Sequence, residues 1–545
     1  MDIIKKYKYQ ILIIIATSLF FLPFLGEVHL FDWDEINFAE AAREMLASGD
    51  YTSVRIDYQI FYEKPPLFIW IQAASMAIFG VNEFAARLPN VIVGIFTFLF
   101  IFSIGKKLVN NIFGLLWILA YSGSLLPQLY FRTGIIDPLF NLFIFIGIYF
   151  LYSYYLDYKF KNLLSSSLLI SLAILTKGPV ALLIVSIVWI VFYFLKRKTI
   201  KFTYWQFPLF TILSILPFLI WNLAVMIKTG NIVINDFIQY NIRLLSTEDA
   251  GHGGPFYYHF IVILIGCFPA SIVAIRGYFG LTESNPKLKI FESWNFILFL
   301  TVLVIFSIVN TKIIHYSSLC YLPLTFFAAR ALNELYLNKI KLYRYQVILI
   351  GLIGLIISLA FTLIPLIFIN KEYFLPKITD KFIFEILKAD VHWSGFEFIF
   401  GIILTLTLTF TIIQIIKGHH FKPLLLLFSI SGLTIFFILI TITPKIEQYL
   451  QSTSIEFYKS LQQQDVFINT DFKSYAPYFY QQKPIHLSAS GLGISQDNYN
   501  SLIKSGNPGK PVYMIFSIKE IKKAKNVPNS SIVAIKNGFI FVRRF

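Results

Sequence analysis

The sequence is poor in charged residues, because Asp, Glu, Lys and Arg together make up only 14% of its 545 residues. A soluble protein of this size carries about 25%. In place of charge the chain has 57% hydrophobic residues, in continuous apolar runs of about 20 residues that recur along its length. The runs do not alternate with polar residues, which excludes a transmembrane barrel. The composition therefore predicts an all-α polytopic membrane protein.

Cysteine is also scarce. The two cysteines, Cys267 and Cys320, lie inside apolar runs, which excludes a disulfide framework and a thiolate metal site. Acidic residues are fewer than basic ones, 30 against 46, which gives a net charge of +16. Nucleic-acid binding would need these cations gathered on one soluble face, and no such cluster is present. We therefore expect no nucleic-acid partner and interpret the cations as anchors beside membrane lipids.

Lysine and arginine recur in every second connection between the apolar runs, which orients the chain. Lys106-Lys107, Lys159 and Arg276 are examples, and the positive-inside rule places such loops in the cytoplasm. The N-terminus is then cytoplasmic and, after thirteen spans, the C-terminus lies outside. The predicted spans are 9–28, 86–105, 112–131, 138–156, 163–176, 179–195, 206–227, 257–275, 293–309, 314–333, 346–369, 395–416 and 423–440.

A polar tail follows the last predicted span. Strand-like runs occur at 465–468, 512–516, 531–535 and 538–542, and Asn537-Gly538 between the last two fits a tight hairpin turn. We expect a transmembrane domain over residues 1–440 and a small α/β domain over residues 441–545, on the outer side of the membrane.

Carboxylates gather in the predicted first outer loop, about residues 29–85, although the charge rule does not require this. Asp34 is a favourable N-cap for an amphipathic helix that Gly49 ends. A second short apolar helix follows Glu63-Lys64-Pro65-Pro66, because proline is favoured in a first turn. Both helices are too short to span, so we expect them in the plane of the outer interface.

Most lysines and arginines lie in the predicted cytoplasmic loops. Three lysines are exceptions, since Lys64, Lys177 and Lys312 lie at the predicted outer ends of spans. Cations that share one surface suit a phosphate or diphosphate, and the nearby acidic groups can supply a base. This combination predicts a lipid-linked phosphate substrate at the outer leaflet. The alternative is that the lysines only reach lipid headgroups and that Asp34 only caps its helix.

Other polar groups fall near the same predicted face. Arg132 and Asp137 flank a span boundary, where a structural ion pair is the alternative to a functional role. His252 and Tyr257 precede a span, where a flexible loop with an aromatic belt is the alternative. Tyr316 follows Lys312 at the start of another span, where the alternative is an interfacial anchor.

These motifs resemble those of the bacterial lipid A aminoarabinose transferases, in the clan that includes protein O-mannosyltransferases. The resemblance covers roughly residues 25–330. It rests on Asp34-Glu35, Tyr62-Glu63-Lys64-Pro65-Pro66, Arg132-x-x-x-x-Asp137-Pro138, Thr176-Lys177-Gly178-Pro179 and Lys312-Ile313-x-x-Tyr316. One departure is the order Phe61-Tyr62, where the family often has Tyr-Phe, so that the phenol is moved by one residue.

The resemblance implies a GT-C glycosyltransferase of the plasma (inner) membrane with thirteen spans and a periplasmic C-terminal domain. It implies a polyprenyl-phosphate-linked sugar donor and a lipid, protein or glycan acceptor. Our hypothesis for the reaction is an inverting displacement at the anomeric carbon. No cofactor is certain; a divalent metal at Asp34 is one alternative if the acceptor is a phosphate. A transporter or lipid flippase is the rival class, and a receptor or scaffold a further one. The transporter or flippase is disfavoured, because the charges gather at one face and no internal repeat is visible. The receptor or scaffold is disfavoured because it leaves the acidic first loop unexplained.

The expected site residues combine this resemblance with position on the predicted outer face. We expect catalytic roles for Asp34, Asp137 and Glu35, donor-phosphate binding by Lys64, Tyr62, Arg132, Lys177, Lys312 and Tyr316, and acceptor or loop roles for Glu63, His252 and Tyr257.

Overall fold

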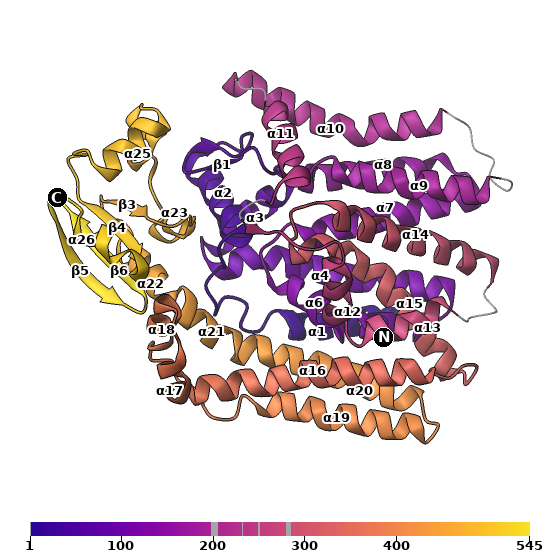
Figure 1. Ribbon diagram of the computed structural model, residues 1–545. Helices are drawn as coiled ribbons and strands as arrows, with labels where there is room; N and C mark the ends of the chain where they lie inside the picture. The colour runs from indigo at the N-terminus through magenta and orange to yellow at the C-terminus, as the bar shows by residue number, and fades with distance from the viewer. Residues whose placement is uncertain (1, 198–204, 231–232, 249–250, 280–284) are drawn as a thin grey trace.

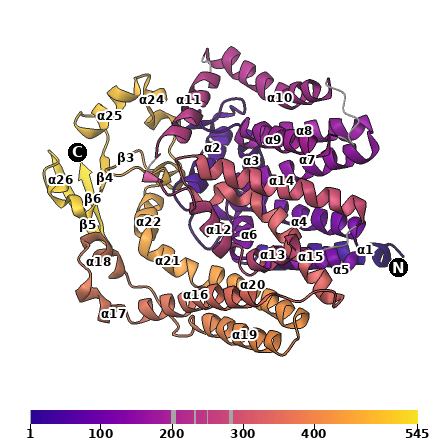
Figure 2. The ribbon, with the colours of Figure 1, turned by 45° about the vertical axis from the view of Figure 1, so that its right-hand side comes forward.

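The computed structural model describes residues 2–197, 205–230, 233–248, 251–279 and 285–545. Most of its helices before Thr441 run side by side as a bundle, and a small sheet with short helices lies at one end of that bundle (Figure 1). Figure 2 shows the start of the chain far from this sheet, across the bundle. The predicted fold class, a polytopic helical protein with a small C-terminal α/β region, is confirmed.

In the described residues, seven helices are long and apolar enough to cross a membrane, or nine if each of two bent pairs is one span. The bent pairs are α5 (Asn111–Ser122) with Leu125–Arg132, at 87°, and α12 (Tyr258–Gly266) with α13 (Ala270–Tyr278), at 103°. The seven are α4 (Glu83–Leu108), α7 (Asp137–Asp157), α10 (Gln206–Thr229), α14 (Pro286–Ile308), α16 (Arg344–Ile369), α19 (Ile399–Ile416) and Phe421–Leu450, which contains α20 (Phe421–Thr441) and α21 (Thr443–Leu450).

The other four predicted spans also coincide with helices, but these are shorter or carry more charge. They are α1 (Asp2–Phe21), α8 (Phe160–Lys177), α9 (Val180–Lys196), and the 3-10 helix η3 (Ile314–Cys320) followed by α15 (Tyr321–Tyr336). The total of thirteen spans therefore stays a prediction. Each predicted segment contains helix, but α1 ends at Phe21, seven residues before the predicted end of the first span at 28.

The first outer loop forms the two predicted short helices, α2 (Asp34–Ser48) and α3 (Leu67–Phe79). Gly49 ends α2 in the left-handed conformation, at φ 69°, as predicted. The predicted N-cap is wrong: Trp33 occupies the cap position, no side chain caps the helix, and Asp34 is its first helical residue. The Asp34 carboxylate turns to His315 instead of to its own helix.

The polar face of α2 is covered by the C-terminal region (residues 443–545). Arg43 donates two hydrogen bonds to Glu40, each 2.7 Å, and a third of 3.2 Å to the carbonyl of Lys483. The Lys483 ammonium in turn lies 2.5 Å from Asp57 of the first outer loop. Burying charges is costly unless they are paired, so these contacts hold the loop and the C-terminal region together.

The C-terminal sheet has the order β3-β4-β6-β5, with β3 and β4 parallel and the other pairs antiparallel. Its strands are β3 (Phe467–Thr470), β4 (Val512–Ser517), β5 (Ser530–Lys536) and β6 (Phe539–Arg544). Asn537 and Gly538, with φ of 44° and 82°, form the predicted two-residue hairpin turn, because such turns require positive φ at both positions.

Short elements complete the chain. They are β1 (Arg55–Ile56), β2 (Gln59–Ile60), α6 (Leu125–Leu129), η1 (Tyr130–Arg132), α11 (Val233–Ser246), α17 (Lys371–Phe374), η4 (Leu375–Lys377), α18 (Lys381–Leu387), α22 (Ser452–Ser460), α23 (Ala476–Gln481), η5 (Ile485–Leu487), α24 (Ala489–Leu492), α25 (Gln496–Lys504), η6 (Ile518–Glu520) and α26 (Ile521–Lys525).

Candidate active site

A polar cavity of about 400 Å³ lies where the first outer loop, the ends of α7 and α8, η3 and the C-terminal region meet. Eight of the twelve residues expected from the sequence line it. They are Asp34, Glu35, Glu63, Lys64, Asp137, Lys177, His252 and Tyr316. The chain thus brings together side chains that are up to 282 positions apart, from Asp34 to Tyr316.

Helix ends place the charged groups of this cavity. Asp34 and Asp137 are the first residues of α2 and α7, and Lys177 is the last residue of α8. The helix dipole favours carboxylates at N-termini and cations at C-termini, so each group sits where its charge is stabilised. Lys177 lies 2.5 Å from Asp137, whose side chain is only 3% exposed.

His315 joins the two carboxylates. Its Nε2 lies 3.3 Å from Asp34 and 3.7 Å from Asp137. Desolvation acts to raise the pKa of Asp34 and is the largest single effect on it. The hydrogen bond and charge of His315, together with the charges of two nearby lysines, outweigh desolvation and lower the pKa of Asp34 to about 2. With 37% of its side chain exposed, Asp34 is an ionised carboxylate that faces the cavity.

Lys64 differs from Lys177 in its partners. Its ammonium lies 4.9 Å from the centre of the Tyr240 ring and 3.5 Å from the Tyr240 hydroxyl. In the part of the chain that the structure describes, it makes no ion pair. Lys177 also lies 4.9 Å from the centre of the Tyr316 ring. Of these two lysines, Lys177 is therefore neutralised by a carboxylate, and Lys64 is available to an anion.

An apolar groove of about 350 Å³ opens onto the cavity. Glu63, Lys64, Lys177 and Tyr316 line both spaces, so the two lysines stand at their junction. The rest of the groove is lined mainly by α9, α11 and the end of α14, with Val180, Leu183, Phe237, Ile238, Ile242, Leu245, Ile305, Phe306 and Val309. An apolar chain that ends in an anion fits this arrangement, with the chain in the groove and the anion beside the lysines.

Two expected cations lie elsewhere. Lys312 is buried, and its ammonium donates to the carbonyls of Phe306, Ser307 and Val309 at 3.3, 2.7 and 2.5 Å. It thereby caps the end of α14, whose last carbonyls have no helical partners. Arg132 likewise donates to carbonyls at the end of α1, the shortest bond being 2.6 Å to Pro23. The alternative Arg132–Asp137 pair is not formed, because Asp137 pairs with Lys177.

Two of the three tyrosines expected from the sequence do not line the polar cavity. Tyr62 lines a different cavity of about 540 Å³ beside Lys228, and Tyr257 is 59% exposed and does not line the polar cavity. Tyr240, which α11 supplies, is instead the phenol next to Lys64. A tyrosine on an amphipathic helix gives no sequence signal for this contact, because the approach of α11 to the first outer loop is a tertiary feature.

Glu35 has both carboxylate oxygens engaged. Arg87 of α4 donates to it at 2.7 and 2.9 Å, and the main-chain nitrogens of Gly134 and Phe31 donate at 2.6 and 2.9 Å. A buried bidentate pair with two further donors leaves little capacity for a ligand. Glu35 therefore ties the start of α2 to α4 and to the loop before α7.

Several lining residues were not predicted. His315 could have been identified from its place between Lys312 and Tyr316, within a motif that the resemblance already used. Lys473 and Tyr475 come from the C-terminal region, which carries no recognisable motif. Among the described residues, no group of three or more His, Cys, Asp or Glu side chains is arranged to hold a metal ion.

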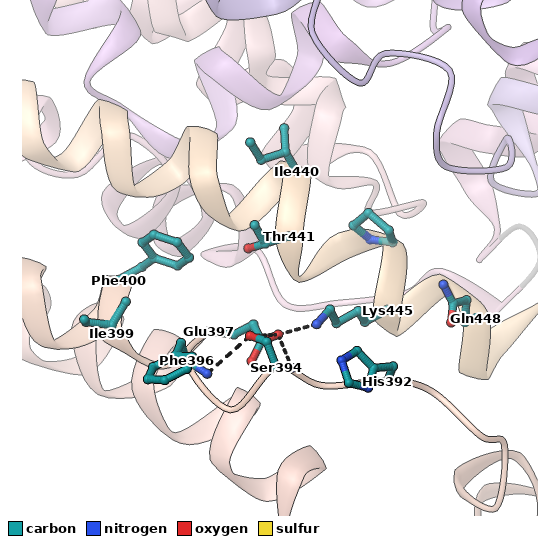
Figure 3. Close-up of a pocket in the computed structure, with 11 residues that line it drawn as sticks. His392, Ser394, Phe396, Glu397, Ile399, Phe400, Ile440, Thr441, Lys445 and Gln448 are labelled. Carbon is teal, nitrogen blue, oxygen red and sulfur yellow. Dashed lines mark hydrogen bonds and ion pairs between the residues drawn. The ribbon is translucent and has the colours of Figure 1, made fainter.

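A second cavity, about 480 Å³ in volume, lies beside the ends of α19 and α20 (Figure 3). Its carboxylate, Glu397, accepts hydrogen bonds from the main chain and hydroxyl of Ser394, both 2.9 Å, and also pairs with Lys445. None of the expected site residues lines this cavity.

Two solved structures share the fold along nearly the whole chain. The crystal structure of ArnT from Cupriavidus metallidurans bound to undecaprenyl phosphate matches with a TM-score of 0.74 at 17% identity, covering 98% of each chain. The apo-state structure matches with a TM-score of 0.74 at 16% identity, covering 99% of this chain and 98% of the other. These comparisons establish the fold, which this chain shares with both structures along nearly its whole length.

Comparisons of the amino-acid sequence relate the chain to particular glycosyltransferases. Residues 63–221 match the family described as dolichyl-phosphate-mannose-protein mannosyltransferase. An undecaprenyl phosphate-alpha-4-amino-4-deoxy-L-arabinose arabinosyl transferase of Wigglesworthia glossinidia brevipalpis is 28% identical over 391 residues, 68% of this chain and 66% of that protein. The transferase of the same name from Pectobacterium carotovorum subsp. carotovorum (strain PC1) is 26% identical over 343 residues, 61% of this chain and 60% of its own length.

The chain thus matches less than two thirds of the length of each of these two relatives, 66% of the first and 60% of the second. The predicted resemblance to the aminoarabinose transferases is confirmed, and the transporter or flippase alternative is not favoured.

Proposed function

We propose that the chain is a membrane glycosyltransferase that moves a sugar from a polyprenyl-phosphate donor to an acceptor at the outer leaflet of the plasma membrane. One observation carries this proposal: Lys64 and Lys177 stand at the junction of an apolar groove and a polar cavity. The groove accommodates the polyprenyl chain, and Lys64, which has no described ion-pair partner, binds the phosphate. The sugar then lies in the cavity beside Asp34.

The reaction is a displacement at the anomeric carbon with inversion. An acceptor oxygen forms a bond to this carbon while the bond from the carbon to the phosphate oxygen breaks. The electron pair leaves with polyprenyl phosphate, whose charge Lys64 stabilises. A hydroxyl acceptor also loses its proton to a base, whereas a phosphate acceptor is already nucleophilic.

Asp34 faces the cavity as an ionised carboxylate with a pKa of about 2. A general base works best with a pKa near the working pH, so a carboxylate this acidic is a weak base. We therefore assign Asp34 to orienting the acceptor and to stabilising the positive charge that develops at the anomeric carbon. Asp137 positions Lys177 and His315, with which it is in contact.

We also propose the orientation that the charge pattern predicts, with the N-terminus cytoplasmic and the C-terminal region periplasmic. The positions of the N-terminus and the sheet on opposite sides of the bundle support it (Figure 2). The acceptor in this proposal is a lipid such as lipid A, a protein or a glycan.

The test is transfer by the purified full-length protein in lipid vesicles, supplied with undecaprenyl-phosphate aminoarabinose and with other undecaprenyl-phosphate sugars. We expect one donor to be consumed, with undecaprenyl phosphate released in equal amount to the glycosylated product. Mass spectrometry of glycolipids from a strain without the gene should show that donor accumulated. If no donor accumulates and no sugar is transferred, the proposal is wrong.

A further inference from the structure

Helix α2 contributes three residues to the lining of the polar cavity, and one of them has no role in the displacement described above. The three are Asp34, Glu35 and Asn37. Residues three apart on a helix share one face, with about 5–6 Å between their Cβ atoms, so Asn37 lies beside Asp34. Asn37 lines the cavity but not the apolar groove, so it belongs to the part of the site that holds the sugar in the proposed function.

The side chain of Asn37 is buried and has no partner. Only 5% of the residue is exposed, and within the described ranges its amide makes no hydrogen bond. Among the described side-chain atoms that line the polar cavity or the apolar groove, its amide oxygen is the only one that is both buried and without a hydrogen-bond partner. A buried polar group without a partner costs free energy, and a ligand that supplies the partner removes this cost.

Other buried asparagines do not share this property. Asn90 donates two hydrogen bonds of 2.6 Å to main-chain carbonyls. Asn222 and Asn295 each donate at 2.9 Å to the carbonyl four residues earlier in their own helices. Main-chain acceptors fix these three amides, whereas the amide of Asn37 keeps its donor and its acceptor available to a ligand.

An amide with a free donor and a free acceptor matches a hydroxyl group, which also donates and accepts. Rotation about the last side-chain bond exchanges the amide oxygen and nitrogen, so either atom can turn toward the cavity. The two carboxylates of α2 are less suited to this contact. Asp34 is bonded to His315, and Glu35 is held by Arg87 and by two main-chain nitrogens.

We propose that Asn37 recognises a hydroxyl group of the donor sugar and thereby helps to select which polyprenyl-phosphate sugar the protein binds. This inference rests on the proposed function, because it names a residue that contacts the substrate of the same reaction. No bond forms or breaks at Asn37, so its role is in specificity. A hydrogen bond made to the sugar, and not to the phosphate, changes the affinity for sugar-bearing lipids alone.

The first test is binding to the full-length protein in detergent, measured by displacement of radiolabelled undecaprenyl phosphate. The competitors are undecaprenyl phosphate, undecaprenyl-phosphate aminoarabinose and undecaprenyl-phosphate mannose. We expect the wild type to bind at least one sugar-bearing lipid more tightly than undecaprenyl phosphate. Asn37→Leu, which has a similar shape and no hydrogen-bonding group, should weaken binding of that lipid about tenfold and leave undecaprenyl phosphate within about twofold.

Thermal unfolding separates this role from a structural one. Asn37→Leu removes a buried polar group that has no partner, so the unfolding temperature should stay the same or rise. Asn295→Leu, the same change at a buried residue of α14 outside the cavity and the groove, should leave the preference for the sugar unchanged. Asn37→Ala, which has a smaller side chain, should show the same loss of sugar binding. Wild-type binding of the sugar-bearing lipid by Asn37→Ala would overturn the proposal.

Monodeoxy analogues of the preferred sugar identify the hydroxyl. One analogue should bind the wild type about tenfold more weakly, and Asn37→Leu should cause no further loss with that analogue, because the two changes remove the same hydrogen bond. If the losses from Asn37→Leu and from every analogue simply add, Asn37 contacts no hydroxyl and the proposal is wrong.

These binding experiments do not depend on transfer. If the wild type transfers no sugar in the vesicle assay, the proposed function fails, and the displacement experiment still shows whether Asn37 recognises a sugar. If the wild type transfers sugar but binds no sugar-bearing lipid more tightly than undecaprenyl phosphate, the proposed function stands and the inference about Asn37 fails.

Discussion

The polar cavity and the cavity beside α19 and α20 contain similar residues. They differ in whether the charged groups are already paired with other groups of the protein. Each has a lysine–carboxylate pair and a histidine. In the second cavity Glu397 pairs with Lys445 and accepts a hydrogen bond from the Ser394 hydroxyl (Figure 3). The main-chain nitrogen of Gly395 also donates to it, so its oxygens are satisfied. In the polar cavity, Asp34 faces open space and Lys64 makes no ion pair with a described residue.

The difference teaches that residue type alone does not mark a site. A charged group that is paired within the protein contributes to stability. A charged group without such a partner can bind a ligand. Substitutions in the two cavities should therefore affect different properties, activity in the first and stability in the second.

The largest effect is expected for Lys64→Ala. Removal of the cation at the groove junction should lower kcat/KM for the donor about 10³-fold, because the leaving phosphate loses its charge partner. The assay is sugar transfer from an undecaprenyl-phosphate donor. Lys106→Ala, an exposed lysine at the far end of α4, is the matched control and should keep wild-type activity. Equal rates in both variants would remove Lys64 from the site.

Asp34→Asn should have the next largest effect. The change keeps the shape of the side chain but removes its charge, so transition-state stabilisation and orientation of the acceptor should fall and kcat should drop about 10²-fold. Steady-state kinetics with saturating donor measures this drop. Glu35→Gln is a useful contrast, since Glu35 is bound to Arg87 and its loss should mainly reduce thermal stability. A larger loss of kcat in Glu35→Gln than in Asp34→Asn would reverse the two assignments.

His315→Phe should change the pH dependence. Without the hydrogen bond and charge of His315, the pKa of Asp34 should rise from about 2 toward its ordinary value of 3.8. A carboxylate is active here in its ionised form, which is lost as pH falls through its pKa. The acid limb of kcat/KM should therefore move to higher pH in the variant, and transfer between pH 3 and 7 measures it. An unchanged acid limb would show that His315 does not set the ionisation of Asp34.

The smallest effect on activity is expected in the second cavity. Lys445→Met leaves the buried Glu397 without its cation and should destabilise the protein by about 1–3 kcal/mol, with transfer activity within about twofold of wild type. Thermal unfolding in detergent and the transfer assay test the two halves of this prediction. Glu397→Gln in the Lys445→Met background should recover part of the stability. A loss of activity without a loss of stability would make this cavity a functional site.

Much of the fold could be predicted from the sequence because it depends on local patterns. The apolar runs, the short helices beside Gly49 and Pro65-Pro66, and the Asn537-Gly538 hairpin each follow from neighbouring residues. The site was predicted less completely. Lys312 and Arg132 share the sequence features of Lys64, but main-chain carbonyls at helix ends hold them. Which carbonyls lie near a given cation depends on how helices pack.

By itself, then, the sequence determined that this is a polytopic membrane protein, that Asp34 and Lys64 lie in the loop between its first two predicted spans, and that it resembles the aminoarabinose transferases. Tertiary structure alone decided which charged groups stay available. It brought His315 between Asp34 and Asp137, placed Tyr240 beside Lys64, and added Lys473 from the C-terminal region. The physical reason is that helix formation depends on short-range patterns, whereas the neutralisation of a charge depends on whatever the fold places within a few ångströms of it.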